Sequence, residues 1–145
     1  MRSWRGVSGA AVLVVALAAC GEDGWDSVVE PGYLEYYGTA APISAPATAR
    51  TGEPVVVRVD TFGGGCTDFE STEVTTSATA ADVQPLDRRV IPSGNGGCTL
   101  ILEMITHEAT LTFDTPGMKT VTIHGRHVDS RGEQAVAIPV MISVE

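Results

Sequence analysis

The chain has little positive charge. Nine lysines and arginines stand against 18 acidic residues, which gives a net charge of −9. Without Arg2 and Arg5, both within the first 19 residues, seven basic residues remain and the net charge is −11. A nucleic-acid-binding surface needs clustered basic side chains. We therefore expect no nucleic-acid partner, and no electrostatic adhesion of the domain itself to anionic lipid headgroups.

From residue 39 to its end, the chain also lacks apolar residues at helical spacing. Threonine and valine dominate after residue 40, and Gly or Pro recurs about every ten residues, which is typical of a β-sandwich or barrel. The clearest strand is "EPVVVRVDTF", residues 53–62, in which Val55, Val57 and Val59 alternate with more polar positions. The pattern predicts an all-β domain.

Motifs that carry catalysis are missing. No serine lies in a G-x-S-x-G turn, "SGNGG" is followed by no lysine or helix, and no D-x-D-x-D-G calcium loop occurs. The thiol of Cys66 has Asp68 and Glu70 nearby instead of the bases that activate a thiolate. We interpret the acids as a solvated face, and predict no enzyme activity, no cofactor and no metal.

Three histidines are the remaining candidates for chemistry. A zinc site needs about three such ligands together, and His107, His124 and His127 lie near acids such as Asp129. His124 and His127 are three positions apart, so on a strand their side chains leave opposite faces. We interpret them as surface histidines near strand ends. The alternative is a metal-binding or enzymatic protein, which requires the three histidines to converge.

The N-terminus has the features of an export signal. Arg2 and Arg5 precede "GAAVLVVALAA", Gly9 to Ala19, which is shorter than the roughly 20 apolar residues of a membrane-spanning helix. A positive start, a short apolar run and small residues at its end predict a signal peptide over 1–19.

The residues at its end, Leu17-Ala18-Ala19-Cys20, resemble the lipobox of bacterial lipoproteins. The resemblance implies that Cys20 becomes the new N-terminus and carries a diacylglycerol. Two or three acyl chains anchor a protein firmly, whereas one alone binds marginally. The expected location is the cell envelope, either the outer membrane facing the periplasm or the outer face of the cytoplasmic membrane. An ordinary signal peptide with an incidental cysteine is the alternative.

Two cysteines remain, Cys66 and Cys98, separated by 32 positions and each flanked by glycine. An exported protein lies in a compartment that permits disulfides. We predict one bridge between them. Two free thiols, or a metal pair that lacks its other ligands, are the alternatives.

The predicted organisation is a signal peptide over 1–19, a lipid-bearing cysteine and tether over 20–39, and one β domain over 40–145. "GEDGWDSVVEPG" is polar and rich in glycine, as tethers are. "YLEYYG" favours a strand and is either an edge strand or a patch packed on the domain.

Within the domain, Pro85 predicts an edge or a bulge. "CTLILEMI" and "EATLTF" predict one long bent strand or two. In the last strand, the side chains expected to point inward are those of Val136, Ile138, Val140, Ile142 and Val144. Pro139 faces the other way, as suits an edge.

Two stretches carry a second resemblance. "ISAPATARTGEPVVVRV" is similar to the opening of bacterial immunoglobulin-like domains, and "FDTPGMKTVTIHG" to a later turn and strand of that superfamily and of PKD-type domains. The chain departs at Met118–Lys119, where a tyrosine is usual, and in its cysteine positions. The resemblance implies a two-sheet sandwich of seven to eight antiparallel strands. Fold alone does not give function.

A lipid-anchored sandwich that presents its loops to a protein or envelope polymer is the function this pattern favours, because recognition usually lies on loops. The glycine-rich loops around the two cysteines predict a binding surface that includes Phe62, Phe69 and Asn95. A passive envelope component without a specific ligand is a further alternative.

Overall fold

A computed structural model describes residues 25–145 of the chain. The predicted signal segment 1–19 and Cys20 lie outside these residues. The described part is all-β, as predicted. Its strands are β1 (Asp26–Pro31), β2 (Tyr33–Tyr36), β3 (Thr39–Ala40), β4 (Ile43–Ser44), β5 (Thr48–Ala49), β6 (Pro54–Gly63), β7 (Thr67–Thr76), β8 (Ala80–Ile91), β9 (Glu103–Thr112), β10 (Gly117–Asp129) and β11 (Gly132–Val144).

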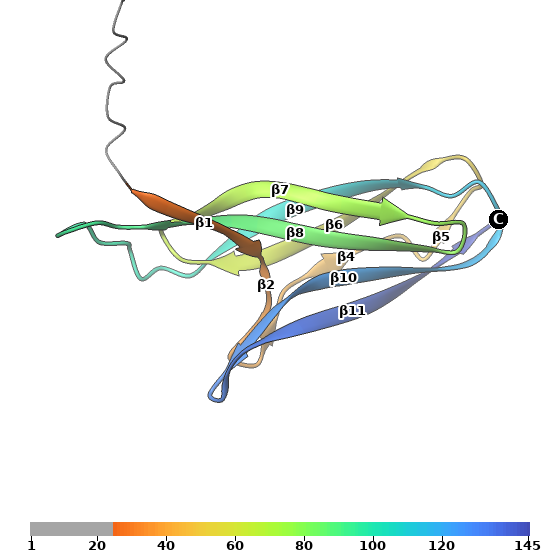
Figure 1. The fold of residues 1–145 in the computed structure, drawn as a ribbon. Coiled ribbons are helices and arrows are strands. Elements are labelled where there is room, and N and C mark those ends of the chain that lie inside the picture. The colour runs from red at the N-terminus through yellow and green to blue at the C-terminus, as the bar shows by residue number, and fades with distance from the viewer. Residues whose placement is uncertain (1–24) are drawn as a thin grey trace, which may run out of the picture.

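The strands form one continuous, curled sheet (Figure 1). One half contains β7, β8, β10 and β11, and the other contains β9, β6 and β4. Strand β2 joins the halves, because it pairs with β10 on one side and with β6 on the other. The sheet therefore bends around a core as a half-barrel. The two-sheet immunoglobulin-like arrangement stays a prediction.

The expectation of antiparallel pairing is wrong for three pairs. β10 runs parallel to both β8 and β2, and β11 runs parallel to β5. The cause is the path of the chain. After β8 it crosses to the other half to form β9 beside β6, and then returns as β10.

The domain begins earlier than the predicted boundary at residue 40. β1 pairs with β8 along its whole length, from Asp26 opposite Ile91 to Pro31 opposite Leu86. In β2, Leu34 is completely buried in the core. Residues 26–36 are therefore part of the sheet and not of a tether, and the tyrosine-rich segment supplies the strand that links the two halves.

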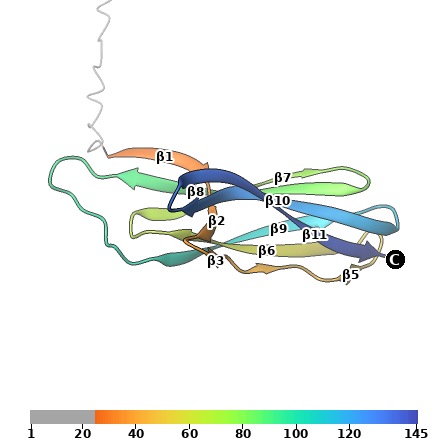
Figure 2. The ribbon, with the colours of Figure 1, turned by 90° about the horizontal axis from the view of Figure 1, so that it is seen from below.

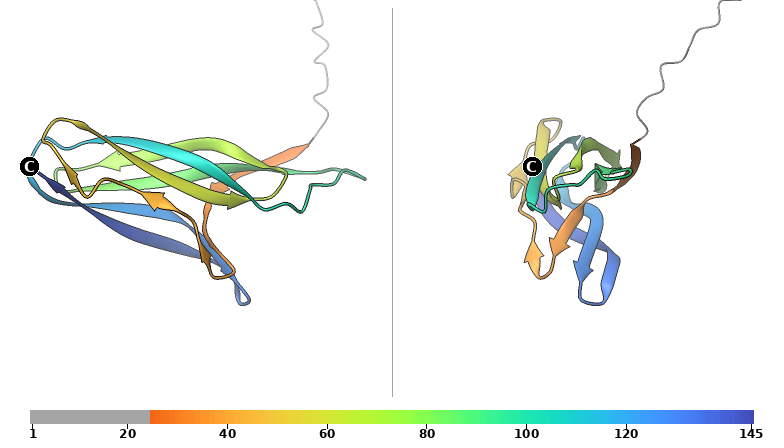
Figure 3. Two further views of the ribbon diagram at one scale, coloured as in Figure 1. Left: turned by 180° about the vertical axis from the view of Figure 1, so that it is seen from behind. Right: turned by 90° about the vertical axis from the view of Figure 1, so that its left-hand side faces the viewer.

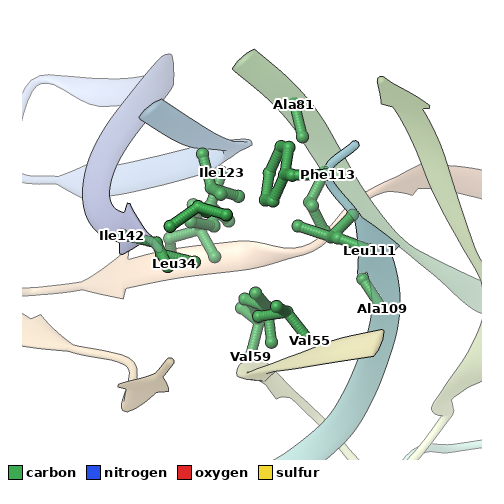
Figure 4. Packing of buried hydrophobic residues seen from close by; sticks show 13 residues of the cluster. Leu34, Val55, Val59, Ala81, Ala109, Leu111, Phe113, Ile123 and Ile142 are labelled. Atoms are coloured by element: carbon green, nitrogen blue, oxygen red, sulfur yellow. The ribbon is translucent and has the colours of Figure 1, made fainter. Parts of the chain in front are cut away.

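The core lies between the two halves and is built from the predicted alternation (Figure 4). Every second side chain of β6 points inward, and Val55, Val57 and Val59 are at most 3% exposed. The remaining buried apolar side chains of this cluster are Leu34, Ala81, Val83, Ala109, Leu111, Phe113, Val121, Ile123, Ile142 and Val144.

Both proline positions have a clear structural reason. β8 pairs with β10 over 80–83 and with β1 over 86–91, so Pro85 lies at the change of partner. Its missing N–H removes no ladder bond on that side. Pro139 lies on β11, which among the described strands pairs only with β10 at that level, so its edge placement is confirmed.

The prediction of a strand over "CTLILEMI" is wrong for its first half. Strand β9 begins only at Glu103, opposite Gly63 of β6. Residues 92–102 form a long loop that extends from the end of the molecule where β1 begins, whereas the C-terminus lies at the opposite end (Figures 1 and 2). This loop carries Leu100, Ile101 and Leu102 on the surface, since no strand within residues 25–145 covers them.

Candidate functional site

A groove of about 520 Å³ lies at the loop end of the molecule. Its floor comes from β2 and the end of β6, one wall from β1, β8 and β10, and the other wall from the loop after Cys98. The view from behind and the end view show how β2 crosses between the two halves (Figure 3).

The floor is aromatic. Tyr33 and Tyr36 meet edge to face with their ring centroids 5.8 Å apart, and Tyr36 lies 6.2 Å from Phe62. The backbone holds this arrangement because Tyr33 of β2 pairs directly with Phe62 of β6. Aromatic faces offer a large apolar contact area with little side-chain freedom to lose.

The charged wall is centred on Arg126 of β10, whose side chain is only 10% exposed. Its guanidinium lies 3.0 Å from Glu30 Oε1 and 3.2 Å from Glu133 Oε2, and it donates to the carbonyl of Pro31. The guanidinium carbon Cζ lies over the ring of Tyr33, 3.9 Å from the ring centroid. Arg126 therefore ties β1, β2 and β11 to β10.

Glu30 lies between two arginines. Arg89 Nε donates to its Oε1 at 2.9 Å, and Arg126 approaches the same oxygen. Burial acts to raise the pKa of Glu30, but the hydrogen bonds from Arg89 and Arg126 outweigh it and hold that pKa below 4.5. The carboxylate thus stays ionised, and together with Glu133 it balances the two positive charges of Arg89 and Arg126.

Tyr33 has a hydrogen-bonded hydroxyl. It donates to Glu133 Oε2 at 2.6 Å. Burial and this hydrogen bond raise the pKa of Tyr33 from 10.0 to about 12. Tyr33 therefore stays neutral and contributes an aromatic face to the groove.

The loop wall is held by the Cys66–Cys98 disulfide, so the predicted bridge is confirmed. Beside it, Gly65 N–H donates to the carbonyl of Thr99 at 3.2 Å. A Cβ on Gly65 would lie only 1.6 Å from Thr99 Oγ1, so glycine is required at this close approach. Leu100, Ile101 and Leu102 follow directly and form the outer wall.

A buried polar cluster lies in the core at the same end. His107 Nε2 is 2.8 Å from Asp87 Oδ1, and Thr61 donates to Asp87 Oδ2 at 2.9 Å. The other ring nitrogen of His107, Nδ1, lies 3.3 Å from the hydroxyl of Thr72. Asp87, His107 and Thr61 are at most 1% exposed. The interpretation of His107 as a surface residue is therefore wrong.

The three candidate histidines do not converge. His124 lies 2.7 Å from Asp82 on the outer side of the sheet, at 41% exposure. His127 Nδ1 lies 2.7 Å from Glu35, at an ion-pair distance without hydrogen-bond alignment. Within residues 25–145, no group of three His, Cys, Asp or Glu side chains is arranged to hold a metal ion.

The three predicted binding residues are spread over this end. Phe62 lines the groove but is only 6% exposed, so it serves as floor and not as an exposed contact. Phe69, on β7, is 53% exposed and packs against His107, with ring centroids 4.9 Å apart. Asn95 lies on the exposed loop. Of the three, Phe62 lines the groove, and Phe69 and Asn95 do not.

Arg126, Glu30 and Arg89 were missed from the sequence, as was the role of Tyr33. Arg126 is out of phase with Lys119, Val121 and Ile123, the buried positions of β10, so no periodic signal marks its side chain as buried. Glu30 lies in a stretch whose polarity is typical of a tether. The alternation of β10 does indicate that Lys119 is buried, because Lys119 is in phase with Val121. Its exposed fraction is 1%.

No protein-family model, no curated protein and no solved structure matches this chain. Among the described residues, no helix has the length and apolarity needed to cross a membrane.

Proposed function

We propose that this protein is a lipid-anchored protein of the bacterial cell envelope whose immunoglobulin-like β domain is a non-catalytic binding module. The groove at the loop end is its binding surface. The observation that carries the proposal is the construction of that groove, which has an aromatic floor between a disulfide-held apolar loop and a neutralised ion-pair wall.

The chemistry of the groove favours an apolar or amphipathic ligand. Arg89 and Arg126 are already paired with Glu30 and Glu133, so the wall offers hydrogen-bonding groups without a large net charge. Tyr33, Tyr36 and Phe62 supply the apolar area. A site with mostly apolar lining and a few fixed polar groups is the usual form of a recognition pocket. A segment of a protein or of an envelope polymer fits this description.

A non-catalytic role is supported by the burial of the His107–Asp87 pair inside the core. His107 and Asp87 are 0% and 1% exposed. A general base must come within hydrogen-bond reach of the substrate proton that it removes. These two side chains already bond to each other and to threonines, and the core encloses them.

The lipid anchor is supported by the "LAAC" junction at Cys20 and by the even pairing of the other two cysteines. The immunoglobulin-like fold is supported by the long strands on two sides of one apolar core. In this arrangement the tether between lipid and sheet is short, because β1 already begins at Asp26.

Site-specific crosslinking in intact cells tests the groove as a binding surface. A photo-reactive amino acid at Val128, in the β10 wall of the groove, should give a discrete crosslinked species that is lost when Tyr36→Ala removes part of the floor. The same probe at Val56, which is 50% exposed on β6 outside the groove, is the matched control. Equal crosslinking at both positions would contradict the proposal.

A zinc titration tests the alternative. We expect purified protein to bind no stoichiometric zinc. Stoichiometric zinc that is lost in both His107→Ala and His124→Ala would replace the binding-module proposal with a metal-site function.

A further inference from the structure

Five large apolar side chains are exposed at the end of the molecule where the described chain begins. We define this apolar tip as the residues Trp25, Ile91, Leu100, Ile101 and Leu102. Their exposed fractions are 51%, 40%, 102%, 62% and 48%. Single exposed apolar residues are normal, but a group at one end of a molecule marks an interaction surface.

Backbone and side-chain contacts gather these residues at one end. Asp26, which follows Trp25, pairs with Ile91. The indole of Trp25 lies against the turn after Ile91, since a Cβ on Gly96 would be 3.6 Å from Trp25 Cη2. The Cys66–Cys98 bridge and the Gly65–Thr99 hydrogen bond then hold the loop that carries Leu100. The loop and the start of β1 lie together in two views (Figures 1 and 2).

The length of the chain before Trp25 indicates what covers this tip. Trp25 follows Cys20 by only five positions. Even a fully extended chain of that length spans at most about 18 Å. If Cys20 carries the lipid, Trp25 of the apolar tip is held within that distance of the bilayer surface, whereas the C-terminus lies at the far end of the domain (Figure 1).

We propose that the apolar tip rests in the interfacial region of the membrane and seats the domain on the bilayer. This inference rests on the lipid anchor of the proposed function, and it names the surface that the loop contacts. Tryptophan is enriched at the membrane interface. Leucine and isoleucine side chains gain free energy when lipid removes them from water.

The contact is apolar and not electrostatic. Asp26 and Glu103 are exposed acids beside the tip, and Arg88 and Arg89 at this end are paired with Glu70 and Glu30. The tip therefore carries no excess of positive charge for anionic lipids. We expect seating on neutral phosphatidylcholine, with little dependence on salt.

Tryptophan fluorescence tests the proposal directly. The chain has two tryptophans, Trp4 and Trp25, and processing before Cys20 leaves Trp25 alone. The mature protein, which begins at Cys20, is extracted from membranes. It is then reconstituted into phosphatidylcholine vesicles with or without brominated acyl chains. We expect bromine to quench Trp25 by about twofold, because indoles settle at the depth of the interface.

Two variants and one control distinguish seating from general proximity. Leu100→Ser, and Leu100→Ser with Ile101→Ser, should reduce the quenching stepwise. Both positions are exposed, so the variants should retain the wild-type melting temperature. Val56→Ser with Met118→Ser removes exposed apolar side chains toward the other end, and should leave the quenching unchanged.

Each outcome has a separate meaning. The seating is overturned if bromine does not quench Trp25 in the acylated protein. It is also overturned if bromine quenches Trp25 in the tip variants as strongly as in the wild type. Crosslinks between two copies at Leu100, without quenching, also overturn it and assign the tip to self-association. An unacylated Cys20, seen in the mass of the same preparation, overturns the lipid anchor and with it the reason for the seating.

Discussion

His107 Nε2 lies 2.8 Å from Asp87 Oδ1 inside the core, where neither side chain is more than 1% exposed. Asp87 belongs to β8 and His107 to β9, so the pair connects the two halves of the curled sheet. Thr61 of β6 donates to the second carboxylate oxygen. This cluster fixes how the halves meet below the groove.

We predict that Asp87→Ala destabilises the domain by about 3 kcal/mol, because it leaves the imidazole buried without its partner. The matched control is Asp82→Ala. It removes an equally short contact, 2.7 Å to His124, from an exposed pair, and should cost less than about 0.5 kcal/mol. Urea unfolding measures both. Similar losses in the two variants would show that the buried cluster has no special structural role.

Removing the disulfide should destabilise the protein and release the loop. A bridge over a separation of 32 residues stabilises by about 3–4 kcal/mol in the chain-entropy model. We expect Cys66→Ser with Cys98→Ser to lower the free energy of unfolding by that amount. Amide exchange should rise mainly over residues 92–102. Peptide mapping without reductant should find the Cys66–Cys98 link in wild type, and two alkylatable thiols there would contradict it.

The stability contributed by Glu30 should depend on pH in a defined direction. Its pKa lies below 4.5 in the folded protein, so its contribution is present above that pH and is lost as the pH falls through the folded-state pKa. Near neutral pH, Glu30→Gln should cost about 2 kcal/mol, a typical value for hydrogen bonds to a charged group. The difference from wild type should shrink in acid.

The control for Glu30 is Glu53→Gln. Glu53 forms a highly exposed pair with Arg50 and should show almost no loss at either pH. Unfolding by urea at neutral pH and below pH 4.5 measures all three proteins. A Glu30→Gln deficit that stays constant in acid would refute the linkage.

Gly125 should tolerate no larger side chain. A Cβ there would lie 2.6 Å from Leu34 Cγ and 2.7 Å from the carbonyl oxygen of Gly32. Because backbone cannot move aside cheaply, Gly125→Ala should cost about 2 kcal/mol through overpacking. Gly97→Ala, with open space around it, is the control and should leave the melting temperature unchanged. A neutral Gly125→Ala would show that β2 is not packed closely on β10.

The sequence predicted the parts of this protein that depend on local pattern. The alternation of Val55, Val57 and Val59 identified β6 and its inward face. With Cys20 assigned to the lipid, two cysteines remain, and this even number predicted the disulfide. These signals work because strand periodicity and thiol pairing need no knowledge of which strands are neighbours.

The groove could not be predicted in the same way, because it depends on long-range pairing. From the sequence, Glu30 belongs to a predicted tether and Tyr33 to a possible edge strand. Their place in the groove follows only from the pairing of β2 with both β6 and β10. The burial of His107 likewise follows from β9 facing Asp87 of β8. The segment around Leu100 was predicted as a strand because three apolar residues in a row favour one. In the structure β9 begins only at Glu103, so these residues lie in the exposed loop.

The mass of the protein extracted from the membrane fraction tests the central claim most directly. We predict a chain that begins at Cys20, carries the mass of an attached diacylglycerol, and loses both the modification and the membrane association in Cys20→Ser. A membrane-derived chain that begins elsewhere, or whose Cys20 is unmodified, would contradict the lipid-anchored binding module.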